Sequence, residues 1–71
     1  MACVNPDGTV TPTAKKVLQA LENPLSVNEL SEQVFLPLFV LKSRLRELAD
    51  YGLIEEQNEK YRITEKGRKK L

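Results

Sequence analysis

The hydrophobic period of this chain changes from helical to extended after Gly52, and this change constrains the fold more than any other feature. Before it, apolar residues recur at the three- and four-residue intervals of amphipathic helices. After it, residues 53–56 and 60–63 have extended character and flank a polar Gln57-Asn58-Glu59 turn, which is typical of a β-hairpin. A chain of 71 residues has room for one small domain. We therefore predict an α+β fold, mainly α, in which a three-helix bundle precedes a two-stranded hairpin and a short C-terminal helix.

Helix-terminal signals mark two helices before residue 37. Thr11-Pro12 fits an N-cap and a first helical residue, and Asn23-Pro24 ends this first helix. Ser26 and Glu29 have the spacing of a capping box, so a second helix begins at residue 27 and ends between residues 34 and 36. The apolar positions at helical spacing in these two helices are Ala14, Val17, Leu18, Leu21, Val27, Leu30 and Val34.

A third and longer helix follows. Pro37 fits its first turn, where the fixed φ suits a helix and the missing N–H costs nothing. Gly52 is available for a left-handed cap at its end. Phe35 and Leu38 flank its start, and we expect both to complete the small core. The core stripe of the helix consists of Leu41, Leu45 and Leu48.

The end of the chain adds the hairpin and a final helix. Leu53 and Ile63, together with either the Ile54 or the Tyr61 face, close over the helices. Thr64 can cap a helix over residues 65–71, in which Gly67 costs about 1 kcal/mol relative to Ala.

Composition excludes most catalytic chemistry. The chain has no His, no Trp and a single Cys, Cys3, which has no partner for an internal disulfide. It shows no nucleophile with a base and no glycine-rich phosphate loop, so we expect no enzyme, cofactor or metal site. The longest apolar stretch, residues 34–41, is too short to span a membrane and contains Pro37. We expect a cytoplasmic protein without a membrane partner.

The first ten residues differ from the rest in composition. They contain the turn-rich series Asn5-Pro6-Asp7-Gly8 and show no hydrophobic period. We predict a flexible N-terminal arm over residues 1–10 and a domain over residues 11–71.

The order of three helices and a hairpin, with few residues between the second and third helices, is that of a helix-turn-helix followed by a β-wing. Over residues 26–67 the chain resembles the winged helix-turn-helix domains of MarR-like and ArsR-like transcription regulators. The matching residues are Glu29-Leu30-Ser31-Glu32, Leu36, Leu45, Leu48, Gly52-Leu53-Ile54, Tyr61-Arg62-Ile63-Thr64 and Glu65-Lys66-Gly67.

This resemblance implies a transcription regulator that binds double-stranded DNA, with helix 37–51 in the major groove and hairpin 53–63 as the wing. It also implies a homodimer, because one recognition helix makes few base contacts. Helical rotation places Phe39, Lys42, Ser43 and Arg46 away from the core stripe and Arg44 nearer its edge. The candidate DNA-binding residues are Phe39, Lys42, Ser43, Arg44, Arg46, Lys60 and Arg62.

Two departures from the family pattern favour an alternative, a winged helix that binds a protein partner or its own copy. Phe35 occupies a turn position that usually holds Gly, and an apolar series replaces the polar start of the recognition helix. Phe39 is a large ring on the face opposite the core, so we expect it to contact something. The candidate protein interface is the apolar patch of Leu38, Phe39 and Val40.

Charge is nearly balanced, with 11 Lys and Arg against 10 Asp and Glu. Attraction to phosphate must therefore come from local clustering of the third helix with the C-terminal basic residues. In the alternative without a functional role, the basic side chains only keep the helix surface hydrated, and Arg46 pairs with Asp50 one turn away. The C-terminal basic residues are Lys66, Arg68, Lys69 and Lys70.

Overall fold

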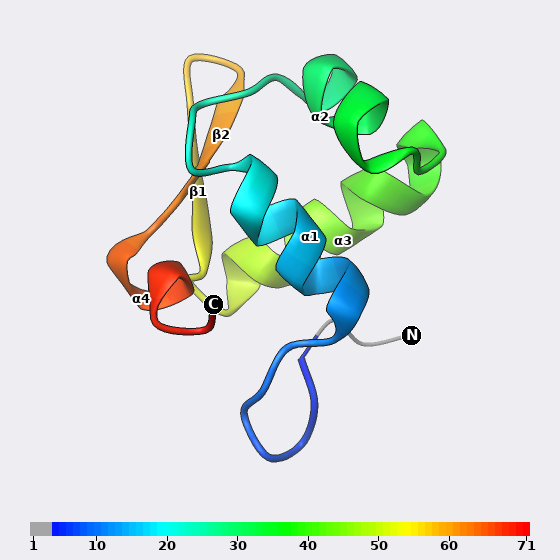
Figure 1. Ribbon diagram of the computed structural model, residues 1–71. Helices are drawn as coiled ribbons and strands as arrows, with labels where there is room; N and C mark the ends of the chain where they lie inside the picture. Colours follow the sequence, from blue (N-terminus) through cyan, green and yellow to red (C-terminus); the bar gives the residue numbers. More distant parts are fainter. Residues whose placement is uncertain (1–3) are drawn as a thin grey trace.

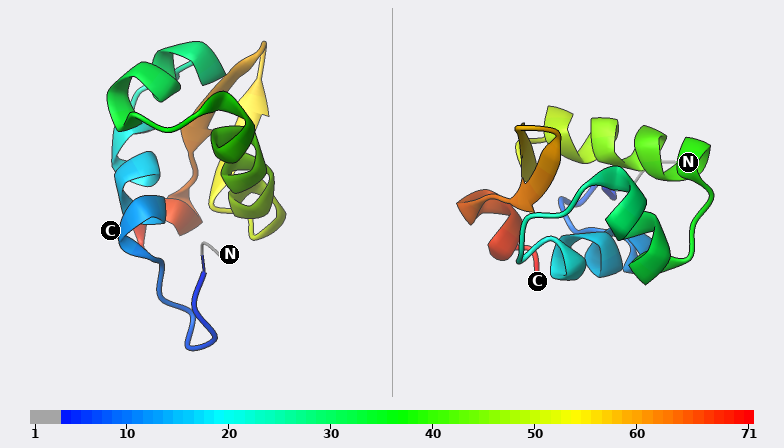
Figure 2. Two further views of the ribbon diagram at one scale, coloured as in Figure 1. Left: turned by 90° about the vertical axis from the view of Figure 1, so that its right-hand side faces the viewer. Right: turned by 90° about the horizontal axis from the view of Figure 1, so that it is seen from above.

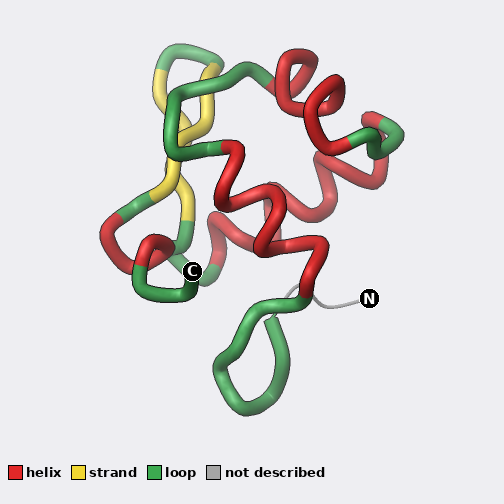
Figure 3. The backbone as a smooth tube through the Cα atoms, viewed as in Figure 1, coloured by secondary structure: helices red, strands yellow, loops and turns green. Residues whose placement is uncertain are grey.

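The computed structural model describes residues 4–71, so Cys3 lies outside the described residues. Three helices form a bundle, and a hairpin with a short helix lies at one end of it (Figures 1 and 3). This order confirms the predicted fold class. The elements are α1 (Pro12–Ala20), α2 (Val27–Val34), α3 (Leu38–Asp50), β1 (Ile54–Gln57), β2 (Lys60–Ile63) and α4 (Glu65–Arg68).

The core lies between the three longer helices and the base of the hairpin. Seen from above, α1 and α3 run along opposite sides of the molecule, so α3 has one face toward the core and one toward solvent (Figure 2). Each residue predicted for the core stripe of α3 is buried, as are the stripe residues of α1. The buried core consists of Ala14, Val17, Leu18, Leu21, Leu30, Leu41, Leu45, Leu48, Leu53, Ile54 and Ile63, with Val27 and Val34 partly buried against it.

The predicted caps of the first two helices are confirmed. The Thr11 hydroxyl accepts a hydrogen bond from the Ala14 N–H at 3.3 Å. In the capping box of α2, the Ser26 hydroxyl accepts from the Glu29 N–H at 3.2 Å, and a Glu29 carboxylate oxygen accepts from the Ser26 N–H at 2.9 Å. These bonds fix the helix starts as the sequence indicates.

The end of α1 differs from the prediction, because the helix stops at Ala20 rather than at Asn23. The Leu21 carbonyl accepts a hydrogen bond from the Ile63 N–H of β2 at 2.9 Å. Four residues later, Leu25 pairs with Tyr61 through two backbone hydrogen bonds of 3.0 and 2.8 Å. The connection between α1 and α2 thus pairs with β2 through an isolated bridge and fixes the hairpin to the helices.

The hairpin is shifted by one residue from the predicted first strand. Gln57 pairs with Lys60, which leaves a two-residue turn of Asn58 and Glu59, both with positive φ. The register places Tyr61 on the same face as the buried Ile54–Ile63 pair. The Ile54 face and the Tyr61 face, predicted as alternatives for covering the helices, are therefore the same face of the hairpin. Tyr61 packs partly buried against the core, and this burial raises the pKa of its hydroxyl.

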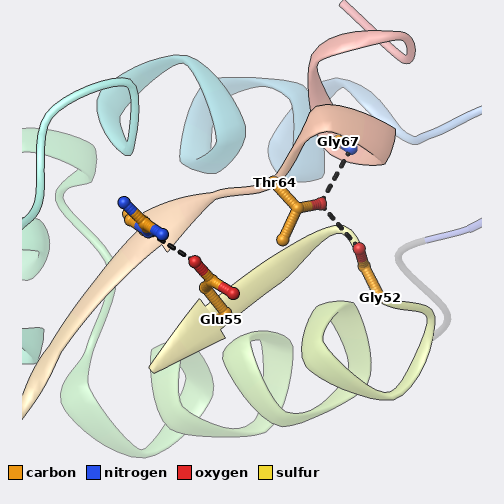
Figure 4. Close-up of polar contacts among 5 residues, drawn as sticks. Gly52, Glu55, Thr64 and Gly67 are labelled. Atoms are coloured by element: carbon orange, nitrogen blue, oxygen red, sulfur yellow. Dashed lines mark hydrogen bonds and ion pairs between the residues drawn. The ribbon is translucent and has the colours of Figure 1, made fainter. Parts of the chain in front are cut away.

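Helix α4 begins where predicted but ends at Arg68 rather than at residue 71. The Thr64 hydroxyl accepts from the Gly67 N–H at 3.1 Å and donates to the Gly52 carbonyl at 2.6 Å, which joins α4 to the end of α3 (Figure 4). Gly67 is buried against Leu53 and Ile63. The low helix propensity of Gly67 therefore matters less than its small size, because α4 needs a residue without a side chain at this contact.

The described part of the N-terminal segment forms a closed loop. Val4 bridges Val10, and the Asn5 N–H donates to the Thr9 carbonyl at 2.7 Å. The Lys70 Nζ donates to the Gly8 carbonyl at 2.7 Å, which connects this loop to the C-terminus. A flexible arm over residues 1–10 stays a prediction.

Candidate nucleic-acid interface

The turn between α2 and α3 sets the direction of α3. Phe35 is the C-cap of α2, with φ 56° and ψ 39°, and its N–H donates to the Ser31 carbonyl at 3.0 Å. This left-handed residue turns the chain sharply after α2. Pro37 was predicted to lie in the first turn of α3, but it is the N-cap, one position earlier. Its carbonyl accepts a hydrogen bond from the Leu41 N–H at 2.9 Å.

Helix α3 presents one stripe to solvent. Phe39, Lys42, Ser43 and Arg46 are all exposed, and their spacing of three, four and seven residues puts them on one face. Leu41, Leu45 and Leu48 occupy the opposite, buried face. Arg44 and Val40 are half-buried at the sides of the helix. These positions agree with the helical rotation predicted from the sequence, and we refer to the four exposed residues as the α3 stripe.

Two residues expected in the core lie at the surface instead. Phe35 is 88% exposed and Leu38 is 43% exposed, so the prediction that they complete the core is wrong. The reason is local geometry, because the left-handed backbone at Phe35 accompanies an outward side chain. The next residue, Leu36, packs partly buried against the core in its place.

The start of α3 is apolar and without negative charge. The first turn contains no acidic residue, and within the described chain no side chain caps this helix. Phe39 is 78% exposed there. Lys16 of α1 and Phe35 line one shallow hollow in the surface, so a cation borders the exposed ring at the turn. This end of the molecule combines two exposed rings, one bordering cation and an uncapped helix N-terminus, which carries a partial positive charge.

The hairpin supplies the other two candidate residues. Lys60 and Arg62 share the hairpin face that is turned away from the buried Ile54–Ile63 pair. Arg62 Nε forms an ion pair with a Glu55 carboxylate oxygen across the strands (Figure 4). Both side chains are about half exposed, at 54% and 46%, so this pair is a surface interaction that contributes little to stability. Lys60 contributes to lowering the pKa of Glu29, after the larger effects of the Ser26 backbone and side-chain hydrogen bonds.

Sequence reasoning missed the exposure of Phe35 and the position of Lys16 beside it, on the α1 side of the turn. The short interval between the end of α2 and Pro37 could have indicated the conformation of Phe35, because so tight a turn requires a left-handed residue at the helix end. Lys16 carried no such signal, because only the packing of α1 beside the turn brings it next to Phe35.

A tri-helical core, a tight turn before an exposed helix and an adjoining hairpin define the class of proteins that carry a helix-turn-helix with a wing. A family model described as winged helix-turn-helix matches residues 13–71. The chain therefore belongs to the winged helix-turn-helix family.

The chain matches no curated protein. Across residues 4–71, no helix has both the length and the apolar character to span a membrane. The same residues contain no cluster of three or more side chains suited to hold a metal ion.

Proposed function

We propose that this domain is a DNA-binding transcription regulator of the MarR-like or ArsR-like type, with α3 in the major groove and the hairpin as its wing. The observation that carries this proposal is the α3 stripe, in which two cations and a hydroxyl lie on the solvent face of one helix. An α-helix with its side chains is about 10–12 Å wide and fits a major groove of about 12 Å.

The chemistry of the stripe suits a nucleic acid. Lys42 and Arg46 are exposed cations that can pair with phosphates, and an arginine can also donate two hydrogen bonds to guanine. Ser43 lies between them on the same face and can bond to a phosphate or a base edge. The uncapped N-terminus of α3 adds backbone N–H groups to the same end.

The wing has a separate role from α3 in this proposal. Lys60 and Arg62 contact the DNA backbone beside the groove, after Arg62 exchanges Glu55 for a phosphate. The net charge of +1 makes non-specific binding weak and strongly dependent on salt. A homodimer doubles the base contacts of a single helix and is part of the proposal.

An amide NMR titration with a mixed-sequence duplex tests this function, first at low salt and then at about 150 mM salt. We expect shifts along the α3 stripe and near Lys60 that fade as salt increases. Arg46→Ala and Arg62→Ala should weaken binding, and each lost phosphate contact should lower the slope of log affinity against log salt by about 1.

Lys15→Ala is the matched control, because it removes one exposed cation from α1, on the other side of the bundle. Lys42→Ala should weaken binding and Lys15→Ala should leave it nearly unchanged. Equal effects of the two variants, or unchanged affinity in Arg46→Ala and Arg62→Ala at low salt, would show that α3 is not the docking face.

A second candidate function is protein interaction through Leu38, Phe39 and Val40. The exposure of Phe39 and Leu38 favours it, because large apolar side chains at the surface commonly mark binding sites. Here Phe39→Ser should abolish association with a partner or a second copy and leave the domain folded. Sedimentation of the wild type and the variant measures the self-association, and thermal unfolding of both checks the fold.

A further inference from the structure

The first turn of α3 has no side chain that can form a hydrogen bond. Residues 37–41 read Pro-Leu-Phe-Val-Leu, so neither donors nor acceptors are available from side chains at this end. In helix-turn-helix proteins, the N-terminal residues of the recognition helix meet the base edges. A helix that begins this way cannot read the donor and acceptor pattern of a base pair with those residues.

One apolar group is present on the base edges of the major groove, the C5-methyl group of thymine. We propose that Phe39 and Phe35 recognise thymine methyl groups, so that this domain selects A·T base pairs through apolar contact. This inference rests on the proposed function and names the feature of DNA that its recognition helix reads.

The position of Phe39 supports this role. Phe39 belongs to the same exposed stripe as Lys42 and Arg46, at the N-terminal end of that stripe. A helix rises about 1.5 Å per residue, so Phe39 and Arg46 are about 10 Å apart along the axis. Phosphate contacts from Lys42 and Arg46 would therefore hold the Phe39 ring toward the floor of the groove.

Phe35 supports it from the preceding turn. Its ring is 88% exposed, and its φ of 56° is a conformation that side chains other than Gly and Asn seldom adopt. Folding therefore accepts backbone strain and an exposed ring at one residue. The tight turn accounts for the left-handed backbone, and a contact with the ligand accounts for the ring, because an apolar ring gains free energy when a methyl group displaces its water.

The surrounding charges favour DNA over a second copy of the chain. Lys42 lies one turn after Phe39 on the exposed face, and Arg46 lies one turn further along it. The first turn of α3 contains no acidic residue. Cations on the α3 stripe would repel the same cations of an identical patch, whereas they attract phosphates that flank a groove.

A pair of duplexes about 20 base pairs long, or two helical turns, tests the inference with the full chain. One duplex is alternating dA-dT and the other is alternating dA-dU, which lacks only the C5-methyl groups. Fluorescence anisotropy at low salt gives both affinities. Burial of one methyl group changes an affinity about fourfold, so two contacts should favour the dA-dT duplex on the order of tenfold.

Variants separate methyl recognition from a difference in duplex shape. Phe39→Ala should bring the two affinities close together and keep salt-dependent binding, whereas Phe39→Leu should retain part of the preference because it keeps an apolar contact. Lys42→Ala is the matched control on the same face. It should weaken binding to both duplexes by the same factor and leave their ratio unchanged. Thermal unfolding confirms that each variant is folded.

The outcomes distinguish this inference from the proposed function. Binding to both duplexes with equal affinity overturns methyl recognition and leaves DNA binding in place. A preference that persists unchanged in Phe39→Ala and Phe35→Ala also overturns it, because the shape of the duplex then carries the difference. Absence of binding to either duplex overturns both proposals, and concentration-dependent sedimentation that Phe39→Ser abolishes would then assign the rings to a protein interface.

Discussion

Gly67 lies so close to Leu53 that a Cβ atom at position 67 would be 2.1 Å from the Leu53 carbonyl oxygen. The same Cβ would lie 2.7 Å from Cγ1 of Ile63. Both distances are well inside van der Waals contact, and one of the two partners is backbone that also accepts a hydrogen bond from the Thr64 N–H at 3.0 Å. Helix α4 is thus seated directly on the segment that joins α3 to β1.

Gly67→Ala should therefore destabilise the domain. Alanine improves helix propensity by about 1 kcal/mol, but overpacking of a close contact costs about 1–3 kcal/mol, and a clash with backbone belongs at the upper end of that range. We expect a net loss of about 1–2 kcal/mol in the free energy of unfolding, measured by urea denaturation. Lys66→Ala on the same helix is the control and should have little effect. An increase in stability in Gly67→Ala would mean that α4 does not pack on Leu53.

Sequence reasoning succeeded where the signal is local. The Ser26–Glu29 box and the Thr11 and Thr64 caps depend on residues three positions apart, and all three form as predicted. The core stripe of α3 could likewise be predicted, because its hydrophobic period lies within one helix. Such features need no knowledge of the rest of the fold.

Sequence reasoning failed for three features that the hydrophobic period does not encode. The end of α1 depends on the Ile63 N–H, which is more than 40 positions away in the chain. The hairpin register was ambiguous because residues 55–59 are all polar and give no alternation between faces. The exposure of Phe35 depends on a left-handed backbone that its side chain does not favour.

The hairpin turn offers a stabilising substitution. Asn58 and Glu59 both have positive φ, at 54° and 65°, as the two central residues of a type I′ turn do. Asn suits this conformation, whereas Glu strains it by about 1 kcal/mol. Glu59→Gly should raise the free energy of unfolding by about 0.5–1 kcal/mol, measured by thermal denaturation.

A second glycine substitution controls for the loss of a glutamate side chain. Glu56 lies within β1, where the backbone is extended, so Glu56→Gly should lower stability by about 0.5–1 kcal/mol. Opposite signs for the two variants support the two-residue turn. Destabilisation by both would place the turn at different residues.

The capping box of α2 makes stability depend on pH. The hydrogen bond from the Ser26 N–H, followed by that involving the Ser26 side chain, holds the pKa of Glu29 below its ordinary value of 4.5. A carboxylate with a lowered pKa stabilises the fold at pH values above 4.5, and this contribution disappears as pH falls through the folded-state pKa. The midpoint temperature of thermal unfolding of the wild type should therefore decrease as the pH falls below 4.5.

Glu29→Gln tests this origin, because the amide keeps an acceptor oxygen but cannot ionise. The thermal unfolding midpoint of Glu29→Gln should depend less on pH in the acid range than the midpoint of the wild type does. Asp7, whose pKa is lowered by its hydrogen bonds from Thr9, remains in both proteins and cancels in the comparison. Glu32→Gln removes the same charge from α2 and should leave the wild-type profile largely intact. Identical acid profiles for wild type and Glu29→Gln would contradict the prediction.

Phe35 should separate stability from binding. Its ring is 88% exposed, so Phe35→Ala removes almost no packing and should change the free energy of unfolding by less than about 0.5 kcal/mol. Phe35→Gly also relieves the left-handed backbone, and it should stabilise the domain by about 1 kcal/mol. Both variants should bind the dA-dT duplex more weakly than the wild type, since each lacks the ring. A loss of about 2 kcal/mol or more in Phe35→Ala would match a buried residue and would place the ring in the core. A gain in stability joined to a loss of affinity would instead show that the strained, exposed ring is kept for its ligand.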